Sequence, residues 1–435
     1  MSARLRKLFN DLAETFWLLP GLLVLAGIGG ALGLVMLDRR GLVGAGLLDS
    51  GWLYDGGATG ARTLLGAVAS STIGVAGTVF SITIAALSLA AGQMGPRLLR
   101  NFTRDRSNQV TLGAFLGTFC YALVVLRSVR TESEGAFIPH LALSVSILLA
   151  FLCVGLLVFF VGHMAGRINV DTVIELVADD VRETVGRLAR PEPAPPPPPP
   201  GFWRDATPVT DPRRGYLQHL DETGLADWAA AKGTAIRLLV RPGDHVFPGA
   251  PIALVTRPVA GVAAAIRRAT ALGPQRTSTD DLEYAVRQLV EVAVRALSPG
   301  INDPHTAISV LDRLATALCE LAPLHLPGGT QWREERVALA VPPFDYDGLA
   351  DAMFHLIRQS AAGNAAVLIH LLGTLAAVLS VEGDPERRAT LRRHAGLVLE
   401  DAERSIANPA DLGDLRRQHL AVPRRDEDAA PRRDD

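Results

Sequence analysis

Few residues of this 435-residue chain have both the type and the spacing that catalysis or metal binding requires. The ten histidines form no close HxxH or HExxH pattern, and Cys120, Cys153 and Cys319 lie far apart without the spacing of metal ligands. No serine lies in a Gly-x-Ser-x-Gly turn, and no glycine-rich phosphate loop ends in Gly-Lys-Ser/Thr. The sequence therefore predicts no metal ion, no cofactor and no enzymatic activity.

One compact polar group, Asn302, Asp303 and His305, lies between two predicted amphipathic helices. Gly300 suits the left-handed conformation that ends a helix, Asp303 can accept backbone N–H groups as an N-cap, and Pro304 suits the first helical position. Because these local roles account for most of the motif, we interpret the segment as a structural loop. A catalytic or ligand-reading loop is the alternative.

The most specific pattern in the chain is a run of small residues in the apolar segment Leu64–Met94 and its flanks. Gly, Ala, Ser and Thr recur there at alternating steps of three and four, which places them along one side of a helix. Such residues let helix backbones approach each other in lipid, and Ser and Thr add hydrogen bonds between helices. This small-residue stripe consists of Thr63, Ala67, Ser70, Gly74, Gly77, Ser81, Ala85, Ser88, Gly92 and Gly95.

The small-residue stripe has two interpretations, which can both hold at different depths. It packs tightly against helices of the same protomer, or it faces the axis of an oligomer, where small polar side chains and exposed backbone line a narrow water path. The candidate residues for helix packing or pore lining are Ser70, Gly74, Gly77, Ser81, Ala85, Ser88 and Gly92.

A cluster of arginines follows the stripe directly. Pro96 breaks or kinks the helix, and the arginines gather at the membrane face, where they indicate cytoplasmic topology and contact with anionic lipid head groups. If the stripe lines a pore, the same arginines would repeat around its inner mouth and attract anions. The cluster consists of Arg97, Arg100, Arg104 and Arg106.

The composition indicates a membrane protein, since 49% of the residues are apolar and the mean hydropathy is +0.23. Four uncharged runs approach or exceed the roughly 20 residues that a helix needs to cross a bilayer. We therefore predict four transmembrane helices over residues 1–167. The runs are Phe16–Leu37, Leu64–Met94, Val110–Leu126 and Ile138–Val161.

Charge placement predicts the orientation of these spans. Four spans leave both termini on one side, and the side that carries Arg4, Arg6, Lys7 and the arginine cluster is expected to be cytoplasmic. Since nearly all basic residues are arginine, we expect a GC-rich bacterial genome and therefore a bacterial inner membrane. The formal net charge of −2 gives no basic field that would indicate nucleic acid as a partner.

After the spans, the sequence predicts a cytoplasmic helical stalk over residues 168–190, because apolar residues there recur at helical spacing. A Pro-rich linker over residues 191–213 follows. We interpret its polyproline run as a semi-rigid spacer, and a ligand for a proline-reading domain is the alternative.

The remaining sequence predicts a small β-unit over residues 214–260, a helical domain over 261–420 and a disordered tail over 421–435. The stretch GDHVFPGAPI in the β-unit resembles half of a biotinyl/lipoyl-type barrel. That resemblance implies a fold only, because no lysine lies at a hairpin tip to carry a swinging cofactor. The expected fold class is a mainly α membrane protein with four transmembrane helices and a cytoplasmic α+β domain.

The run Ala361–Ser380 is also uncharged over about the length of a span. Ala and Gly dominate it, and Asn364 and His370 interrupt it. We interpret it as a buried helix of the cytoplasmic domain. A fifth span, which would place the C-terminus outside, is the alternative.

Three long segments carry a family resemblance: FSITIAALSLAAGQMGPRLLRNFTRD, LGAFLGTFCYALVVL and RQLVEVAVRALSPGINDPHTA. Together they resemble a family of bacterial predicted inner-membrane proteins that is classified only as a domain of unknown function. The resemblance spans nearly the whole chain. It implies a location in the membrane and transfers no catalytic residue.

The stripe and the arginine cluster lead to our functional hypothesis, a homo-oligomeric channel or transport-related protein with a cytoplasmic regulatory domain. Its expected partners are the lipid bilayer, further copies of the chain and, if a pore forms, ions with a preference for anions. The alternative is a membrane-anchored scaffold or stress sensor whose cytoplasmic domain binds a partner.

Overall fold

The computed structural model of the chain describes residues 16–40, 54, 56–94, 105–130, 137–167, 169–277 and 281–422. The predictions for Gly95, for Arg97, Arg100 and Arg104, and for the tail beyond residue 422 lie outside these residues. Two compact units are present. We call the four helices before residue 170 the N-terminal unit and the described residues from 170 onward the C-terminal unit.

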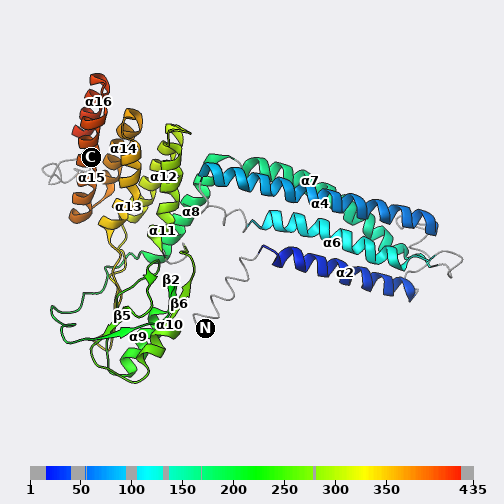
Figure 1. The fold of residues 1–435 in the computed structure, drawn as a ribbon, viewed down its shortest axis with the longest axis horizontal. Helices are drawn as coiled ribbons and strands as arrows, with labels where there is room; N and C mark the ends of the chain where they lie inside the picture. The colour runs from blue at the N-terminus through cyan, green and yellow to red at the C-terminus, as the bar shows by residue number, and fades with distance from the viewer. Residues whose placement is uncertain are drawn as a thin grey trace, which may run out of the picture. The chain divides into compact units, whose positions relative to one another are not determined.

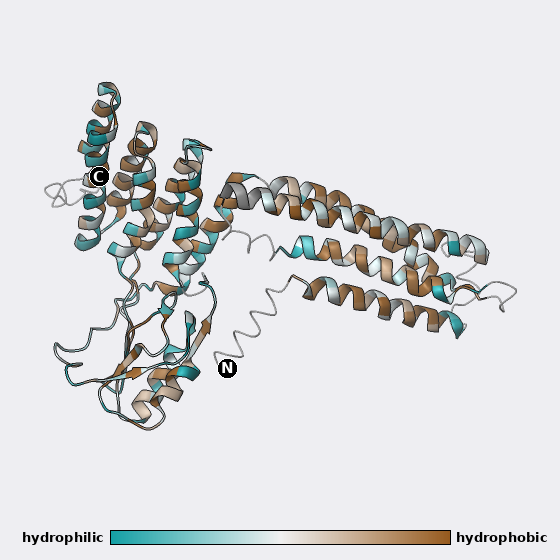
Figure 2. Ribbon diagram, viewed as in Figure 1, coloured by the Kyte–Doolittle hydropathy of each residue, from teal (hydrophilic) through white to brown (hydrophobic). Residues whose placement is uncertain are grey.

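Four helices form the N-terminal unit (Figure 1). All four are long and apolar enough to cross a membrane, and Figure 2 shows hydrophobic residues along most of their length. Each predicted apolar run therefore lies in one such helix, in which the backbone satisfies its own hydrogen bonds, as a bilayer requires. The helices are α2 (Leu18–Arg39), α4 (Ala58–Met94), α6 (Arg106–Ser128) and α7 (His140–Arg167).

Glycines bring α2 and α6 into close contact. A Cβ atom on Gly27 of α2 would lie 2.4 Å from the backbone oxygen of Gly117 in α6, and one on Gly117 would lie 2.8 Å from the backbone oxygen of Leu23. Gly113 and Gly117 have the Gly-x-x-x-Gly spacing that lets helix backbones approach in lipid. The sequence analysis looked for such close packing on α4 and overlooked this pair.

Two carboxylates hold the ends of α7. Asp38, near the end of α2, accepts the backbone N–H groups of Leu141 at 3.2 Å and Ala142 at 3.1 Å. Asp105 caps the start of α6 and lies 2.7 Å from the Nε2 atom of His163, near the other end of α7. These contacts satisfy N–H groups that a helix start leaves without an intrahelical partner.

The C-terminal unit stacks three consecutive helix pairs in two rows (Figure 1). One row contains α11, α13 and α15, and the other contains α12, α14 and α16. Stacking of this kind buries a continuous core between neighbouring pairs, as in helical repeat proteins. The six helices are α11 (Leu282–Ala296), α12 (Pro304–Leu321), α13 (Tyr346–Ser360), α14 (Ala365–Val381), α15 (Pro385–Ser405) and α16 (Pro409–Leu420).

The segment predicted as a stalk, residues 168–190, belongs to this stack. Its helix α8 (Val170–Leu188) packs on α11 and α12. The apolar side of α8, including Val177 and Val181, is buried, and Glu175 accepts a 2.6 Å hydrogen bond from Arg313 of α12. The predicted helix is present, and it packs on the stack because an amphipathic helix buries its apolar side where another helix offers a partner.

The strands of the C-terminal unit form two small sheets, one of five strands in the order β1-β5-β3-β8-β7 and one of three in the order β4-β2-β6. They extend beyond the predicted β-unit of residues 214–260, because strands from the predicted linker and the predicted helical region complete both sheets. The elements are β1 (Thr207–Thr210), β2 (Gly215–Leu220), α9 (Glu222–Ala231), β3 (Ile236–Leu238), β4 (His245–Val246), β5 (Pro251–Val255), α10 (Val262–Ala269), β6 (Thr270–Gly273), β7 (Thr330–Arg333) and β8 (Arg336–Ala340).

The polyproline run of the predicted linker is anchored rather than free. Arg190, just before it, exchanges backbone hydrogen bonds of 3.0 and 2.7 Å with His325. Within the run, the carbonyl of Pro196 accepts a 3.1 Å hydrogen bond from the indole N–H of Trp332 in β7. A proline-rich segment keeps its carbonyls available as acceptors, so it can dock without joining a sheet.

The uncharged run Ala361–Ser380 provides most of α14, and its surroundings agree with a buried helix. Leu371, Leu375 and Val378 are fully buried, and α14 packs against α12, α15 and α16. Most of its large apolar side chains are therefore covered by protein, while Val381 at its end is exposed.

Replacing Gly27 by alanine should destabilise the protein by about 1–3 kcal/mol, because the added methyl group meets the Gly117 backbone and forces α2 and α6 apart. Thermal unfolding of the purified protein in detergent measures the change. Gly33→Ala on the same helix is the matched control, since a Cβ atom there meets nothing within 4 Å. Equal melting temperatures for the two variants would contradict the glycine contact.

Candidate functional site

The small-residue stripe lies on the outside of the N-terminal unit. From Ser70 to Ser88 its predicted residues Gly74, Gly77, Ser81 and Ala85 are all exposed, and Gly92 lies in α4 but outside the residues whose surroundings are described. A Cβ atom on Gly74 or Gly77 would meet nothing within 4 Å. Among the described residues, no other helix of the protomer covers this part of the stripe.

The opposite side of α4 packs into the protomer. Leu65, Val68, Ala76 and Val79 are buried there among residues of the other three helices. The buried residues on this side are small or medium-sized, and they include Ala69 and Ala76 as well as Leu65, so side-chain size alone does not explain which side faces inward. The sequence showed which residues share a side of α4, and the tertiary structure decided which side is covered.

Two hydroxyl groups of the stripe donate to carbonyl groups within α4 itself. Ser70 donates to the carbonyl of Gly66 at 2.9 Å, and Thr63 donates to that of Thr59 at 3.0 Å. Hydroxyls in this arrangement keep acceptor capacity on their outer side. The stripe can therefore face another helix or water without a buried donor being left unpaired.

Large apolar side chains are exposed on the neighbouring helices and, beside the stripe, on α4 itself, where Ile73 and Phe80 are 41% and 42% exposed. Leu25 of α2 is 65% exposed, and Phe151 and Val158 of α7 are each 71% exposed. Large apolar side chains suit contact with lipid tails, whereas a continuous line of Gly, Ala, Ser and Thr suits close approach of another helix.

Of the predicted arginine cluster, only Arg106 lies among the described residues. It is exposed at the first position of α6, next to the capping residue Asp105. The arrangement of the cluster around a pore mouth therefore stays a prediction.

The predicted structural loop joins α11 to α12. The carboxylate of Asp303 accepts the backbone N–H groups of His305 at 3.1 Å and Thr306 at 3.2 Å, and the hydroxyl of Thr306 at 2.6 Å. These bonds, the Thr306 hydroxyl foremost, lower the pKa of Asp303. Pro304 occupies the first turn of α12, as predicted.

One detail of this loop differs from the prediction. The left-handed residue is Asn302, with a φ of 50°, and Gly300 does not have a positive φ. Asparagine tolerates this conformation better than other non-glycine residues do. The turn therefore ends at Asn302, one position before the N-cap. Asp303 accepts backbone N–H groups, and Asn302, Asp303 and His305 do not converge on a common point.

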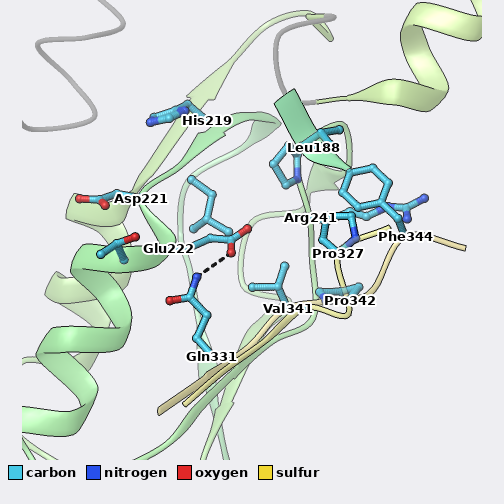
Figure 3. A pocket seen from close by; sticks show the side chains of 14 residues that line it. Leu188, His219, Asp221, Glu222, Arg241, Pro327, Gln331, Val341, Pro342 and Phe344 are labelled. Carbon is cyan, nitrogen blue, oxygen red and sulfur yellow. Dashed lines mark hydrogen bonds between the residues drawn. The ribbon is translucent and has the colours of Figure 1, made fainter. Parts of the chain in front are cut away.

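A pocket that the sequence did not reveal lies beside the start of α9 (Figure 3). Its volume is about 320 Å³. Glu222 accepts a 2.9 Å hydrogen bond from Gln331, and the guanidinium of Arg241 lies 5.3 Å from the ring centre of Phe344. His219 also lines the pocket. Because the lining comes from segments more than a hundred residues apart, no spacing rule could have predicted it.

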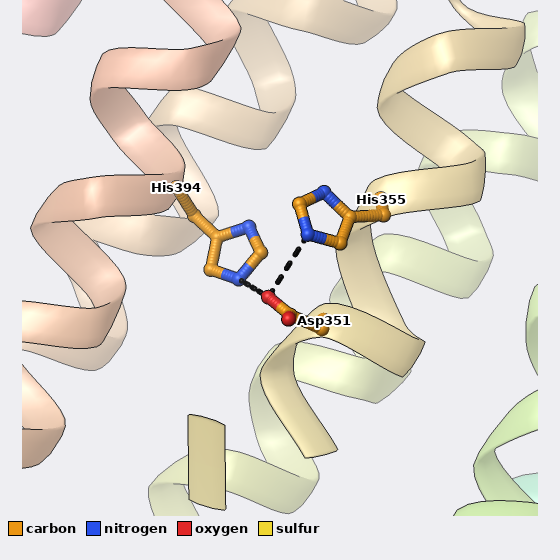
Figure 4. Close-up of side chains that lie close together, drawn as sticks. All are labelled: Asp351, His355 and His394. Atoms are coloured by element: carbon orange, nitrogen blue, oxygen red, sulfur yellow. Dashed lines mark ion pairs between the residues drawn. The ribbon is translucent and has the colours of Figure 1, made fainter. Parts of the chain in front are cut away.

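The structure also brings together Asp351, His355 and His394, a group that the sequence analysis overlooked (Figure 4). Asp351 and His355 are four residues apart on α13, which places them on one side of that helix. The third member comes from α15. The i, i+4 pair was a signal available in the sequence, but nothing local indicated its partner.

Comparison with known proteins matches residues 13–377 to a family described as "Predicted membrane protein (DUF2254)". An uncharacterised protein of Mycobacterium tuberculosis (strain CDC 1551 / Oshkosh) is 32% identical over 433 residues, which cover 94% of this chain and 80% of the relative. An uncharacterised protein of Mycobacterium bovis has the same identity and coverage. No solved structure matches the chain.

Replacing Asp303 by alanine should cost about 0.5–2 kcal/mol of stability through loss of the cap on α12. Thermal unfolding of the purified chain measures this cost. Asp303→Asn is the control, because an asparagine side chain still accepts N–H groups at an N-cap. If Asp303→Ala abolished a function of the protein while its melting temperature and assembly stayed unchanged, the structural interpretation would be wrong.

Proposed function

Because this chain belongs to the predicted membrane protein family described above, we propose that it is a homo-oligomeric channel or transport-related protein of a bacterial inner membrane. In this proposal both termini are cytoplasmic, and the C-terminal unit regulates the N-terminal unit. The observation that carries the proposal is the outward position of the small-residue stripe on α4.

The length of the stripe supports a role across the full membrane. From Thr63 to Ser88 it extends over about 38 Å at 1.5 Å per residue. The hydrocarbon core of a bilayer is about 30 Å thick. A contact or water path along the stripe would therefore cross the whole apolar layer.

The small residues also favour a second copy as the neighbour of α4. Lipid tails pack as well against leucine as against any other apolar side chain. Contact with lipid alone therefore does not require Gly, Ala and Ser at every third or fourth position. A helix of another protomer gains close backbone contact from them. Cyclic symmetry would place the same stripe of every protomer against its neighbour or around a common axis.

At the axis, the serine and threonine hydroxyls would offer polar groups to water and ions. Anion preference follows only if the arginine cluster repeats at the inner mouth of such a pore. A dry stripe would instead hold the oligomer together, and the chain would then act as a membrane-anchored scaffold or stress sensor. The two experiments below separate these outcomes.

Gly77→Leu should break the oligomer, because an isobutyl group on the stripe prevents close approach of a second helix. Light scattering of the purified protein in detergent measures the mass of the assembly. Gly155→Leu on α7 is the matched control, since Gly155 is also exposed and a Cβ atom there meets nothing within 4 Å. A monomeric wild-type protein, or the same assembly for both variants, would contradict the proposed interface.

A pore should make the stripe accessible to water. With Ser81→Cys and Ser88→Cys, a hydrophilic thiol reagent should label the assembled protein above the background of the native cysteines, and reconstituted vesicles should show ion flux that this labelling reduces. Ser71→Cys, exposed on α4 outside the stripe, is the control. Protected stripe cysteines together with no flux from a correctly assembled complex would reject the channel and leave the scaffold or stress sensor.

A further inference from the structure

Asp351, His355 and His394 direct three ligand atoms toward one point between α13 and α15 (Figure 4). The Oδ1 atom of Asp351 lies 3.0 Å from Nε2 of His355 and 3.1 Å from Nε2 of His394. All three atoms lie within 4.8 Å of one another. In the described part of the chain, no other three His, Cys or acidic side chains converge in this way.

His394 is the unusual member of the group. Its side chain is 0% exposed, its Nε2 atom is paired with Asp351, and its Nδ1 atom has no hydrogen-bond partner within the described structure. The ring packs edge-on against Phe354, 5.5 Å away between ring centres. Leaving a buried polar group without a partner costs about 1–3 kcal/mol, so such a group calls for an explanation.

We propose that Asp351, His355 and His394 bind a divalent transition-metal ion of the Zn²⁺ or Co²⁺ type. Two imidazoles and one carboxylate form a ligand set that suits these ions, and it leaves one or more positions open for water or another ligand. The site is independent of the proposed channel, because all three residues belong to the C-terminal unit.

The spacing of the ligand atoms fits such an ion. Metal–ligand bonds of about 2.0–2.2 Å in a tetrahedral site place the ligand atoms about 3.3–3.6 Å apart. The observed 3.0 and 3.1 Å separations need only small side-chain movements to reach that spacing. Asp351 and His355 are also partly exposed, so an ion can reach the site from solvent.

The net negative charge around Asp351 favours a cation. Arg393 donates to Asp351 at 2.7 Å and to Asp347 at 3.2 Å, so two carboxylates share one guanidinium. Burial acts to raise the pKa of Asp351, but Arg393 outweighs it and the pKa is lowered. In the metal complex Arg393 would hold the carboxylate in position, as outer partners of metal ligands commonly do.

A second arginine contacts His355. Arg358 lies 3.3 Å from the Nδ1 atom of His355 and is also paired with Asp401. Metal binding through Nε2 would put the ring proton on Nδ1, so Arg358 would give up this contact and keep its pair with Asp401. The site thus exchanges one long hydrogen bond for a metal–ligand bond.

The test uses the full chain, purified in detergent with a tag that contains no histidine and stripped with a chelator. Titration with Co²⁺ should give visible absorption bands that saturate at one ion per chain, and Zn²⁺ should displace the Co²⁺. Asp351→Asn and His355→Gln should each weaken Co²⁺ binding by on the order of tenfold or more. Zn²⁺ should raise the melting temperature of the wild type but not of Asp351→Asn.

His370→Gln is the matched control. His370 and Asp312 form a pair separated by 2.7 Å on the same unit, with similar exposure but no third ligand. This variant should bind Co²⁺ as the wild type does. Failure of the wild type to bind one ion per chain would overturn the proposal, and so would equal affinities of His355→Gln and His370→Gln, because binding would then be adventitious.

Discussion

Helices that satisfy their own hydrogen bonds gain little hydrophobic attraction from one another inside a bilayer, so close backbone contact has to hold them together. In the N-terminal unit, Gly27 of α2 and the pair Gly113 and Gly117 of α6 provide that contact. The carboxylates of Asp38 and Asp105 then fix the two ends of α7. With these three helices joined, α4 packs on them through a side that includes Leu65 and Ala76, and its small-residue stripe remains outside.

The outer surface of the N-terminal unit combines two kinds of side chain. The exposed sides of α2 and α7 carry large apolar side chains such as Leu25 and Phe151, and α4 exposes Ile73 and Phe80 beside its line of small and hydroxyl-bearing residues. Contact with lipid alone does not require such a line. The exposed line of small residues on α4 is the physical basis of the proposed oligomer.

The C-terminal unit is held together by different forces. Stacked helix pairs bury a continuous apolar core, and the polyproline run is anchored on its surface through the carbonyl of Pro196. Stacking α13 beside α15 also places the buried ring of His394 opposite Asp351 and His355. A stack of this kind can therefore build a polar site from helices that are distant in sequence.

Local patterns in the sequence determined the four apolar helices, the capping role of Asp303 and the family resemblance, because each depends on neighbouring residues or on composition. Other features were decided only by the tertiary structure. Asn302 rather than Gly300 takes the left-handed turn, the small-residue stripe faces outward, and His355 meets His394. These outcomes depend on which surfaces pack together, and packing joins residues through backbone paths that no local spacing encodes.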